Sequence, residues 1–273
     1  MAITFKPGGA AITGNKSKEG RSVVLYGPPF SGKTSTLQYD PSVRTLLIDL
    51  DKNSSVLEES ANVTIIGCDT YQEYLDIKEG VRAGKYKVPG GPEIPMNYDL
   101  YVIDSFTRFE ELIKEYVVEI YAPKRNREIK GKFGAQTDWD DLQRIEIEEV
   151  RDWQAMTRRS ANSVNILWIG HDMEARTSDE FNKTLQLRLQ GKYAAPGIMG
   201  AVDAVFYMYK AKNEQTGQMG FGIYTMDKGP VKAEARLPVK KRLQMPELIW
   251  FPKWGAIYRQ LGATNLPEPP AKK

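Results

Sequence analysis

Short apolar runs rich in β-branched residues recur along the chain, and longer amphipathic stretches separate them. The runs alternate little between apolar and polar positions, which is typical of strands buried on both faces of a parallel sheet. Seven strands are predicted, at residues 22–26, 45–49, 63–66, 100–103, 165–170, 204–209 and 221–226. Apolar residues at helical spacing predict four helices, at residues 34–38, 71–83, 107–121 and 141–161.

The alternation of strands and helices predicts an α/β fold with a mostly parallel central sheet flanked by helices. The last two strands are joined by the polar residues 213–218, so we expect a C-terminal β-hairpin that extends the sheet. Residues 1–20 contain four glycines and little periodicity, which predicts a flexible arm. The proline-rich residues 263–273 are expected to form a disordered tail, which leaves residues 21–262 as one core domain.

Composition constrains the class of protein only weakly. The 273 residues carry 38 basic and 35 acidic side chains, and this formal charge of +3 neither requires nor excludes a polyanionic partner. The single cysteine excludes an intrachain disulfide and a cysteine zinc cluster, and it fits a reducing compartment. The start lacks a signal-like segment and no apolar run is long enough to span a membrane, so we expect a cytoplasmic protein without a membrane partner.

The segment between the first predicted strand and the first predicted helix carries a phosphate-binding motif. It reads GPPFSGKT, which is the spacing G-x-x-x-x-G-K-T of a phosphate-binding loop (P-loop). Backbone N–H groups of such a loop and the dipole of the following helix point at one spot, where they hold phosphate. The predicted contacts to ATP, with Mg²⁺ on the threonine, are Gly27, Pro28, Pro29, Phe30, Ser31, Gly32, Lys33, Thr34 and Ser35.

Polar residues that end the apolar runs are further candidates, because ligands of open α/β sheets lie beyond the carboxyl ends of the strands. Asp104 ends the run at 100–103 and is expected to hold Mg²⁺ opposite Thr34. Asp51 and Asp49 follow the run at 45–48. Asp51 is the first candidate for the base that polarises the attacking water, and Asp49 is the second.

His171, the only histidine, ends the run at 165–170. A hydrogen-bonding side chain at this place can contact the γ-phosphate of a bound nucleotide and respond to its loss. A histidine that simply packs in the core or on the surface is the alternative. One histidine and one cysteine make a zinc site improbable.

These motifs together resemble those of the RecA-like P-loop ATPases, and above all a phage-encoded, single-domain ATP-binding group related to single-strand annealing recombinases. The resemblance covers residues 20–250 approximately. It implies a catalytic carboxylate where Asp51 stands, although the family has the longer glutamate there, so water activation is expected to be slow or differently arranged. Asp104-Ser105 and His171 stand where the family has its magnesium aspartate and its γ-phosphate sensor.

The resemblance also implies a K-x-R pair that reaches the ATP of a neighbouring subunit. Lys240 and Arg242 resemble this pair, and Lys232 with Arg236 forms a competing pair. Two cations from another chain would neutralise the charge that develops on the transferred phosphoryl group. We therefore expect self-association as a ring or filament, with an ordinary solvated basic turn as the alternative.

Two basic segments are candidate contacts to single-stranded DNA, since loops at these two places hold DNA in RecA-like recombinases. Lysine and arginine would neutralise phosphates, and an aromatic ring could stack on bases. The candidates are Arg125, Arg127, Lys130, Lys132, Phe133, Arg176, Lys183, Arg188 and Lys192. Acidic residues nearby weaken the basic field, so solvated loops are the alternative.

The sequence thus predicts an ATPase that couples nucleotide state to single-stranded DNA binding in phage recombination or replication. A P-loop kinase acting on a small molecule would share the loop and the magnesium site, but no arginine-rich lid is evident. The third hypothesis is a nucleotide-gated assembly adaptor with little turnover, which the short side chain of Asp51 favours.

Overall fold

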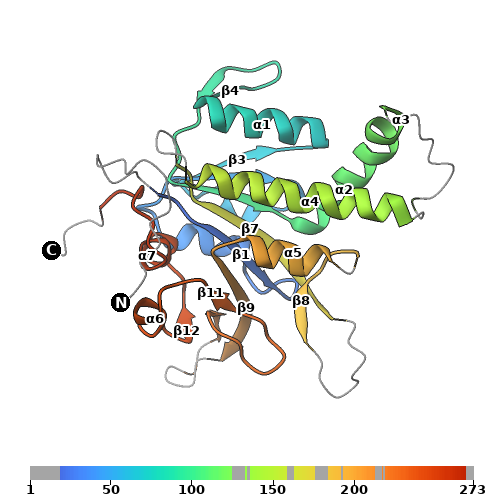
Figure 1. Ribbon diagram of the computed structural model, residues 1–273. Coiled ribbons are helices and arrows are strands. Elements are labelled where there is room, and N and C mark those ends of the chain that lie inside the picture. Colours follow the sequence, from blue (N-terminus) through green and yellow to red (C-terminus); the bar gives the residue numbers. More distant parts are fainter. Residues whose placement is uncertain are drawn as a thin grey trace, which may run out of the picture.

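The computed structural model is an α/β fold in which one large sheet carries helices on both faces (Figure 1). The structure describes residues 19–124, 133, 136–158, 163–175, 184–191, 193–212, 217 and 219–268. Among these residues, no helix combines the length and the apolar character needed to cross a membrane.

The main path of the sheet runs in the order β12-β10-β9-β1-β7-β6-β2-β3. Its parallel part comprises β1 (Ser22–Gly27), β2 (Thr45–Asp49), β3 (Val63–Gly67), β6 (Leu100–Asp104), β7 (Ile166–Glu174) and β9 (Ala204–Lys212). The antiparallel extension consists of β10 (Met219–Tyr224), paired with β9, and β12 (Leu248–Trp250), paired with β10. The short strands β8 (Leu185–Leu187) and β11 (Glu234–Ala235) pair antiparallel with β7 and β9. This order places β7 between β1 and β6.

Alternating strand residues supply two apolar layers, one on each face of the sheet. Val24 and Tyr26 of β1 belong to one layer, whereas Val23 and Leu25 belong to the other. The first layer is covered by α1 (Tyr71–Ala83), α2 (Phe106–Tyr116), α4 (Gln136–Met156) and α5 (Ala194–Ala201). The second layer is covered by η1 (Thr34–Tyr39), η2 (Ser55–Leu57) and α7 (Trp254–Gln260). Burial on both sides explains why the parallel strands are apolar without alternation.

The predicted fold class is confirmed, including the parallel sheet, its flanking helices and the antiparallel β9–β10 hairpin. The details of three helices differ. η1 is a 3₁₀ helix, and the N–H of Thr36 is shared between the carbonyls of Gly32 and Lys33. α2 gives way to the π-helical segment η3 (Val117–Tyr121), followed by α3 (Ala122–Lys124). α4 begins before residue 141, because its polar first turn gives no apolar signal.

Several short elements were not predicted from the sequence. β4 (Lys85–Lys87) and β5 (Glu93–Pro95) form a separate hairpin after α1. α6 (Val239–Arg242) lies between β11 and β12. Elements of two to four residues are too short to show a periodic pattern, so their sequences do not distinguish them from loops.

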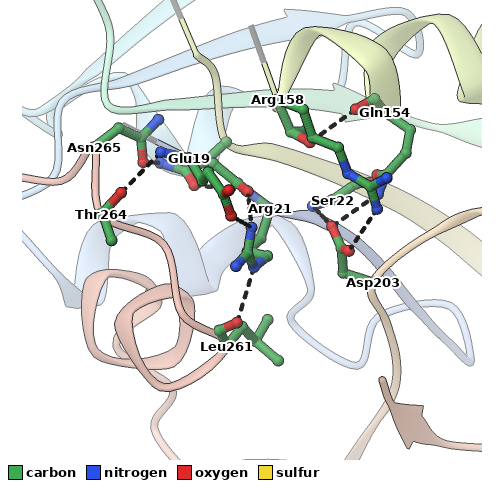
Figure 2. A network of polar contacts seen from close by, with 12 residues as sticks. Glu19, Arg21, Ser22, Gln154, Arg158, Asp203, Leu261, Thr264 and Asn265 are labelled. Atoms are coloured by element: carbon green, nitrogen blue, oxygen red, sulfur yellow. Dashed lines mark hydrogen bonds and ion pairs between the residues drawn. The ribbon is translucent and has the colours of Figure 1, made fainter. Parts of the chain in front are cut away.

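A polar network closes the amino end of the sheet around Arg21, which precedes β1 (Figure 2). The guanidinium of Arg21 donates to the carbonyl of Leu261 at 2.9 Å, and the N–H of Glu19 donates to the Thr264 hydroxyl at 2.8 Å. The Asn165 side chain donates to Asn265 at 2.8 Å. Residues 19–20 and 263–265 therefore pack against the core, so ordered structure extends past both predicted boundaries. The other residues of the predicted arm and tail from 1 to 18 and from 269 to 273 lie outside the described residues.

Candidate nucleotide-binding site

The parallel register brings the predicted site residues to one edge of the sheet. Gly27 at the end of β1 pairs with His171 on β7. Asp104 at the end of β6 pairs with Asp49 on β2 and with Ile169 on β7. Because carboxyl ends of parallel strands meet at one edge, the P-loop and the acidic residues share the same side of the sheet.

The P-loop follows β1 and turns back toward β10. Gly32 has a φ of 82°, and a Cβ atom at this position would lie 2.6 Å from the ring of Phe221. Only glycine satisfies both constraints without a shift in the neighbouring ring. Phe30 has a φ of 59° and is 97% exposed, so it projects from the loop into solvent.

Lys33 is buried beneath the loop. Its ammonium group donates to the carbonyl oxygens of Gly27 at 3.0 Å and Pro28 at 2.8 Å. Burial lowers the pKa of Lys33 to about 8, and the nearby carboxylates of Asp104 and Asp172 oppose this shift. The loop therefore holds a cation at its centre near neutral pH.

Thr34 connects the P-loop to the end of β6. Its hydroxyl donates to Asp104 Oδ2 at 2.5 Å, and the Asp104-Ser105 peptide bond that follows is cis. Burial raises the pKa of Asp104 to about 6, with further raising contributions from Asp51 and Asp49 and opposing ones from the Thr34 hydroxyl and from Lys33. Hydroxyl and carboxylate oxygens are ligands that Mg²⁺ prefers, and here they meet at one point, so these two residues fit a magnesium ion.

The two candidate bases on the loop after β2 lie in different surroundings. Asp49 is buried and its carboxylate accepts the N–H of Ser54 at 3.2 Å, which stabilises the local turn. Asp51 is half-buried, and its charge raises the pKa of both Asp104 and His171. Asp51 is thus free of the turn that engages Asp49 and lies near both of these groups. Its catalytic role stays a prediction.

His171 faces charged groups from several elements. Burial lowers its pKa, as do the charges of Lys33 and Arg188, while Asp51 and Asp172 act in the opposite direction. Its Nδ1 atom is buried and has no hydrogen-bond partner among the described residues. These surroundings favour the neutral form of the imidazole, and the role of His171 as sensor stays a prediction.

Asp172 is a site residue that sequence reasoning missed. Its carboxylate accepts the Tyr207 hydroxyl at 2.9 Å, and its charge raises the pKa of Lys33 and of His171. The available signal was its position, because β7 continues beyond His171 and carries the next side chain past the edge of the sheet.

The predicted trans-acting pair, Lys240 and Arg242, lies on α6, away from the P-loop of the same chain. A Cβ atom on Gly262 would lie 3.2 Å from the guanidinium of Arg21 and 3.6 Å from the ammonium of Lys241. α6 is therefore beside the amino end of β1, whereas the P-loop follows its carboxyl end. The six residues of β1 span roughly 20 Å.

Both candidate pairs contain a cation with an acidic partner in the same chain. Arg242 pairs with Glu234 at 3.4 Å, and the two side chains are 49% and 61% exposed. In the competing pair, the ammonium of Lys232 pairs with Asp227 at 3.1 Å. Exposed ion pairs of this kind contribute little stability, so either cation could exchange partners at low cost.

The predicted DNA contacts fall mostly outside the described residues. Those outside are Arg125, Arg127, Lys130, Lys132, Arg176, Lys183 and Lys192. Phe133 packs edge-on against Trp139, with ring centroids 4.9 Å apart, so its ring already has a partner. Arg188 is exposed, but it lies next to His171 at the edge described above.

The fold, the P-loop and Asp104 at the end of β6 together define a P-loop ATPase. A sequence profile described as the AAA domain matches residues 19–232, which is most of the chain, and the protein belongs to this family. Among curated proteins, none matches the chain significantly.

A solved structure with a similar fold is the KaiC-like protein PH0186 from the hyperthermophilic archaeon Pyrococcus horikoshii OT3. The two chains are 11% identical and superimpose with a TM-score of 0.41, over 76% of this chain and 78% of that one. The strand order and the family match, rather than this distant likeness, carry the assignment.

Proposed function

We propose that this site binds and hydrolyses ATP in the presence of Mg²⁺. The observation that carries the proposal is the 2.5 Å contact between the Thr34 hydroxyl and the Asp104 carboxylate, next to the buried ammonium of Lys33. The two oxygens are suitable ligands for a divalent cation, and the nearby ammonium group can bind phosphate. Both lie at the same edge of the sheet. Membership of the AAA domain family supports nucleotide binding.

Each residue has a definite task in this proposal. The loop N–H groups and Lys33 bind the β- and γ-phosphates. Thr34 and Asp104 hold Mg²⁺, which would neutralise phosphate charge when bound. Asp51 accepts a hydrogen bond from the attacking water and orients it, and His171 hydrogen-bonds to the γ-phosphate as a neutral imidazole.

Hydrolysis is proposed to require a second copy of the chain. Lys240 and Arg242 flank Lys241, whose ammonium lies near Arg21 at the amino end of β1, whereas the P-loop follows the carboxyl end. In a head-to-tail ring or filament, α6 of one copy would face the P-loop of the next, where its cations would stabilise the transition state.

We further propose that nucleotide state is coupled to single-stranded DNA in phage recombination or replication. The chain order supports this reading, because the first basic segment joins α3 to α4 and the second joins β7 to β8. DNA bound at the second segment could respond to the nucleotide through β7, which leads to that segment from His171.

The test is a measurement of phosphate release with and without a single-stranded oligonucleotide, at several salt concentrations. We expect Mg²⁺-dependent turnover that DNA stimulates and that Lys33→Ala abolishes. Lys85→Ala, a change of an exposed lysine on the distant β4–β5 hairpin, is the matched control and should leave turnover intact.

Three outcomes would redirect the proposal. Tight ATP binding without phosphate release would point to the adaptor, and phosphate transfer to a nucleoside monophosphate would point to the kinase. Equal rates with and without DNA, together with no salt-sensitive binding of the oligonucleotide, would remove the DNA part alone.

A further inference from the structure

Arg188 lies at the nucleotide-binding edge rather than at its periphery. β8 pairs antiparallel with the end of β7, with Leu187 opposite Asp172. In the next position, the N–H of Arg188 donates to the carbonyl of His171 at 2.8 Å. His171 in turn pairs with Gly27, the first residue of the P-loop. The backbone of Arg188 is therefore hydrogen-bonded to β7, and β7 is paired with β1, whose last residue begins the P-loop.

The side chains of β8 divide between core and solvent. Leu187 is fully buried, and its Cδ1 would lie 2.2 Å from a Cβ atom on Gly170. Arg188 is the exposed neighbour of Leu187 and has no ion-pair partner among the described residues. The packing of Leu187 holds β8 against β7, so the backbone of Arg188 is fixed in position. Its guanidinium stays free to bind a ligand.

Three groups that favour an anion meet at this edge. The ammonium of Lys33 and the guanidinium of Arg188 both act on His171, whose Nδ1 atom is buried without a partner among the described residues. The carboxylates of Asp51 and Asp172 also act on His171, and that of Asp104 acts on Lys33, at the place where Mg²⁺ and water are proposed to bind. A terminal phosphate at this edge would be attracted by both cations.

We propose that Arg188 contacts the γ-phosphate of a nucleotide bound to its own chain and so distinguishes triphosphate from diphosphate. This inference rests on the proposed nucleotide-binding function of the site. It removes Arg188 from the set of candidate DNA contacts. The planar guanidinium can donate two parallel hydrogen bonds to phosphate oxygens, which the diphosphate lacks at this position.

The test is calorimetric titration of Arg188→Ala with Mg²⁺ and either a non-hydrolysable ATP analogue or ADP. We expect affinity for the triphosphate analogue to fall about tenfold or more, because a charge-assisted hydrogen bond is lost, while affinity for ADP changes less than about twofold. Arg188→Lys keeps the charge without the fork and should give an intermediate loss. Arg151→Ala, a change of an exposed arginine on α4, is the matched control and should bind both nucleotides as the wild type does.

The outcomes separate this inference from the function on which it rests. If the wild type binds no nucleotide, the proposed function is wrong. If the wild type binds both nucleotides and Arg188→Ala loses equal affinity for each or none, the proposed function stands and the role of Arg188 is overturned. A variant with unchanged nucleotide binding but a shallower salt dependence of oligonucleotide binding would return Arg188 to the DNA contacts.

Discussion

Individual residues at the carboxyl edge of the sheet divide into structural and chemical groups. Gly32 and Asp49 are committed to local geometry, the first by its left-handed backbone and the second by the N–H of Ser54. Lys33, Thr34 and Asp104 contact the loop or each other. Gly32 and Asp49 thus shape the site, whereas Lys33, Thr34 and Asp104 carry the polar groups that can bind a ligand.

Asp51→Asn should keep nucleotide binding but lower turnover by roughly 10²–10⁴-fold, because the amide cannot accept a proton from water. Single-turnover phosphate release and calorimetry of the same variant measure the two effects separately. Asp49→Asn is the matched comparison, and it should leave turnover largely intact, since its amide oxygen can still accept the N–H of Ser54. Retained hydrolysis in Asp51→Asn would assign the base to another residue.

Gly32→Ala should greatly weaken nucleotide binding. The new methyl group would meet the Phe221 ring at 2.6 Å and would strain a backbone with a φ of 82°, so the loop must change shape. Gly84→Ala is a useful control, because Gly84 also has a positive φ but no atom near its Cβ position. Calorimetry should detect weaker nucleotide binding only for Gly32→Ala. Equal nucleotide binding by both variants would contradict the requirement for glycine at position 32.

At the scale of elements, the parallel strands and the P-loop were predictable because burial on both faces and a fixed glycine spacing leave clear patterns in sequence. The 3₁₀ form of η1 and the short strand β8 were not predictable, since they depend on contacts formed only in the fold. For the same reason the sequence identified Arg188 as basic but could not place it beside His171, which lies 17 positions earlier. The predicted roles of Asp51, His171, Lys240 and Arg242 stay predictions.

The interface between α4 and α2 buries the carboxyl group of Glu146, which lowers the stability of the folded state. Glu146 is fully buried, and neither of its oxygens has a partner among the described residues. Burial raises its pKa well above the usual value, and Glu110 raises it further while Lys114 opposes the shift. The folded state therefore keeps a proton that the unfolded state releases, so stability is lost as pH rises toward the folded pKa.

Glu146→Gln should remove this pH dependence, because the amide cannot ionise. We expect a melting temperature roughly 2–4 °C above that of the wild type at pH 8, with the difference shrinking as pH falls toward 4.5. Glu148→Gln, which changes an exposed carboxylate paired with Arg144 on the same helix, should shift the melting temperature little. A lower melting temperature for Glu146→Gln at pH 8 would show that the ionised carboxylate has a compensating partner.

At the scale of the whole molecule, the P-loop and α6 lie at opposite ends of β1, so a complete site needs two copies in the proposed mechanism. Arg242→Ala should impair turnover without changing the melting temperature, because its ion pair with Glu234 is exposed. Mixing this variant with Asp51→Asn should restore part of the activity, since some interfaces then combine an intact Asp51 with an intact Arg242. Unrestored activity in a mixed assembly would contradict action in trans.

In the proposed mechanism, Mg²⁺ and a purine nucleoside triphosphate bind together at the P-loop, and Thr34 and Asp104 hold the cation. The decisive experiment is titration of the wild type and of Asp104→Asn with a non-hydrolysable ATP analogue, with and without Mg²⁺. We expect Mg²⁺ to strengthen binding to the wild type at least tenfold, the range of a charge-assisted contact, and to have little effect on Asp104→Asn. Absence of binding heat with any purine nucleotide, or the same Mg²⁺ dependence in both proteins, would contradict it.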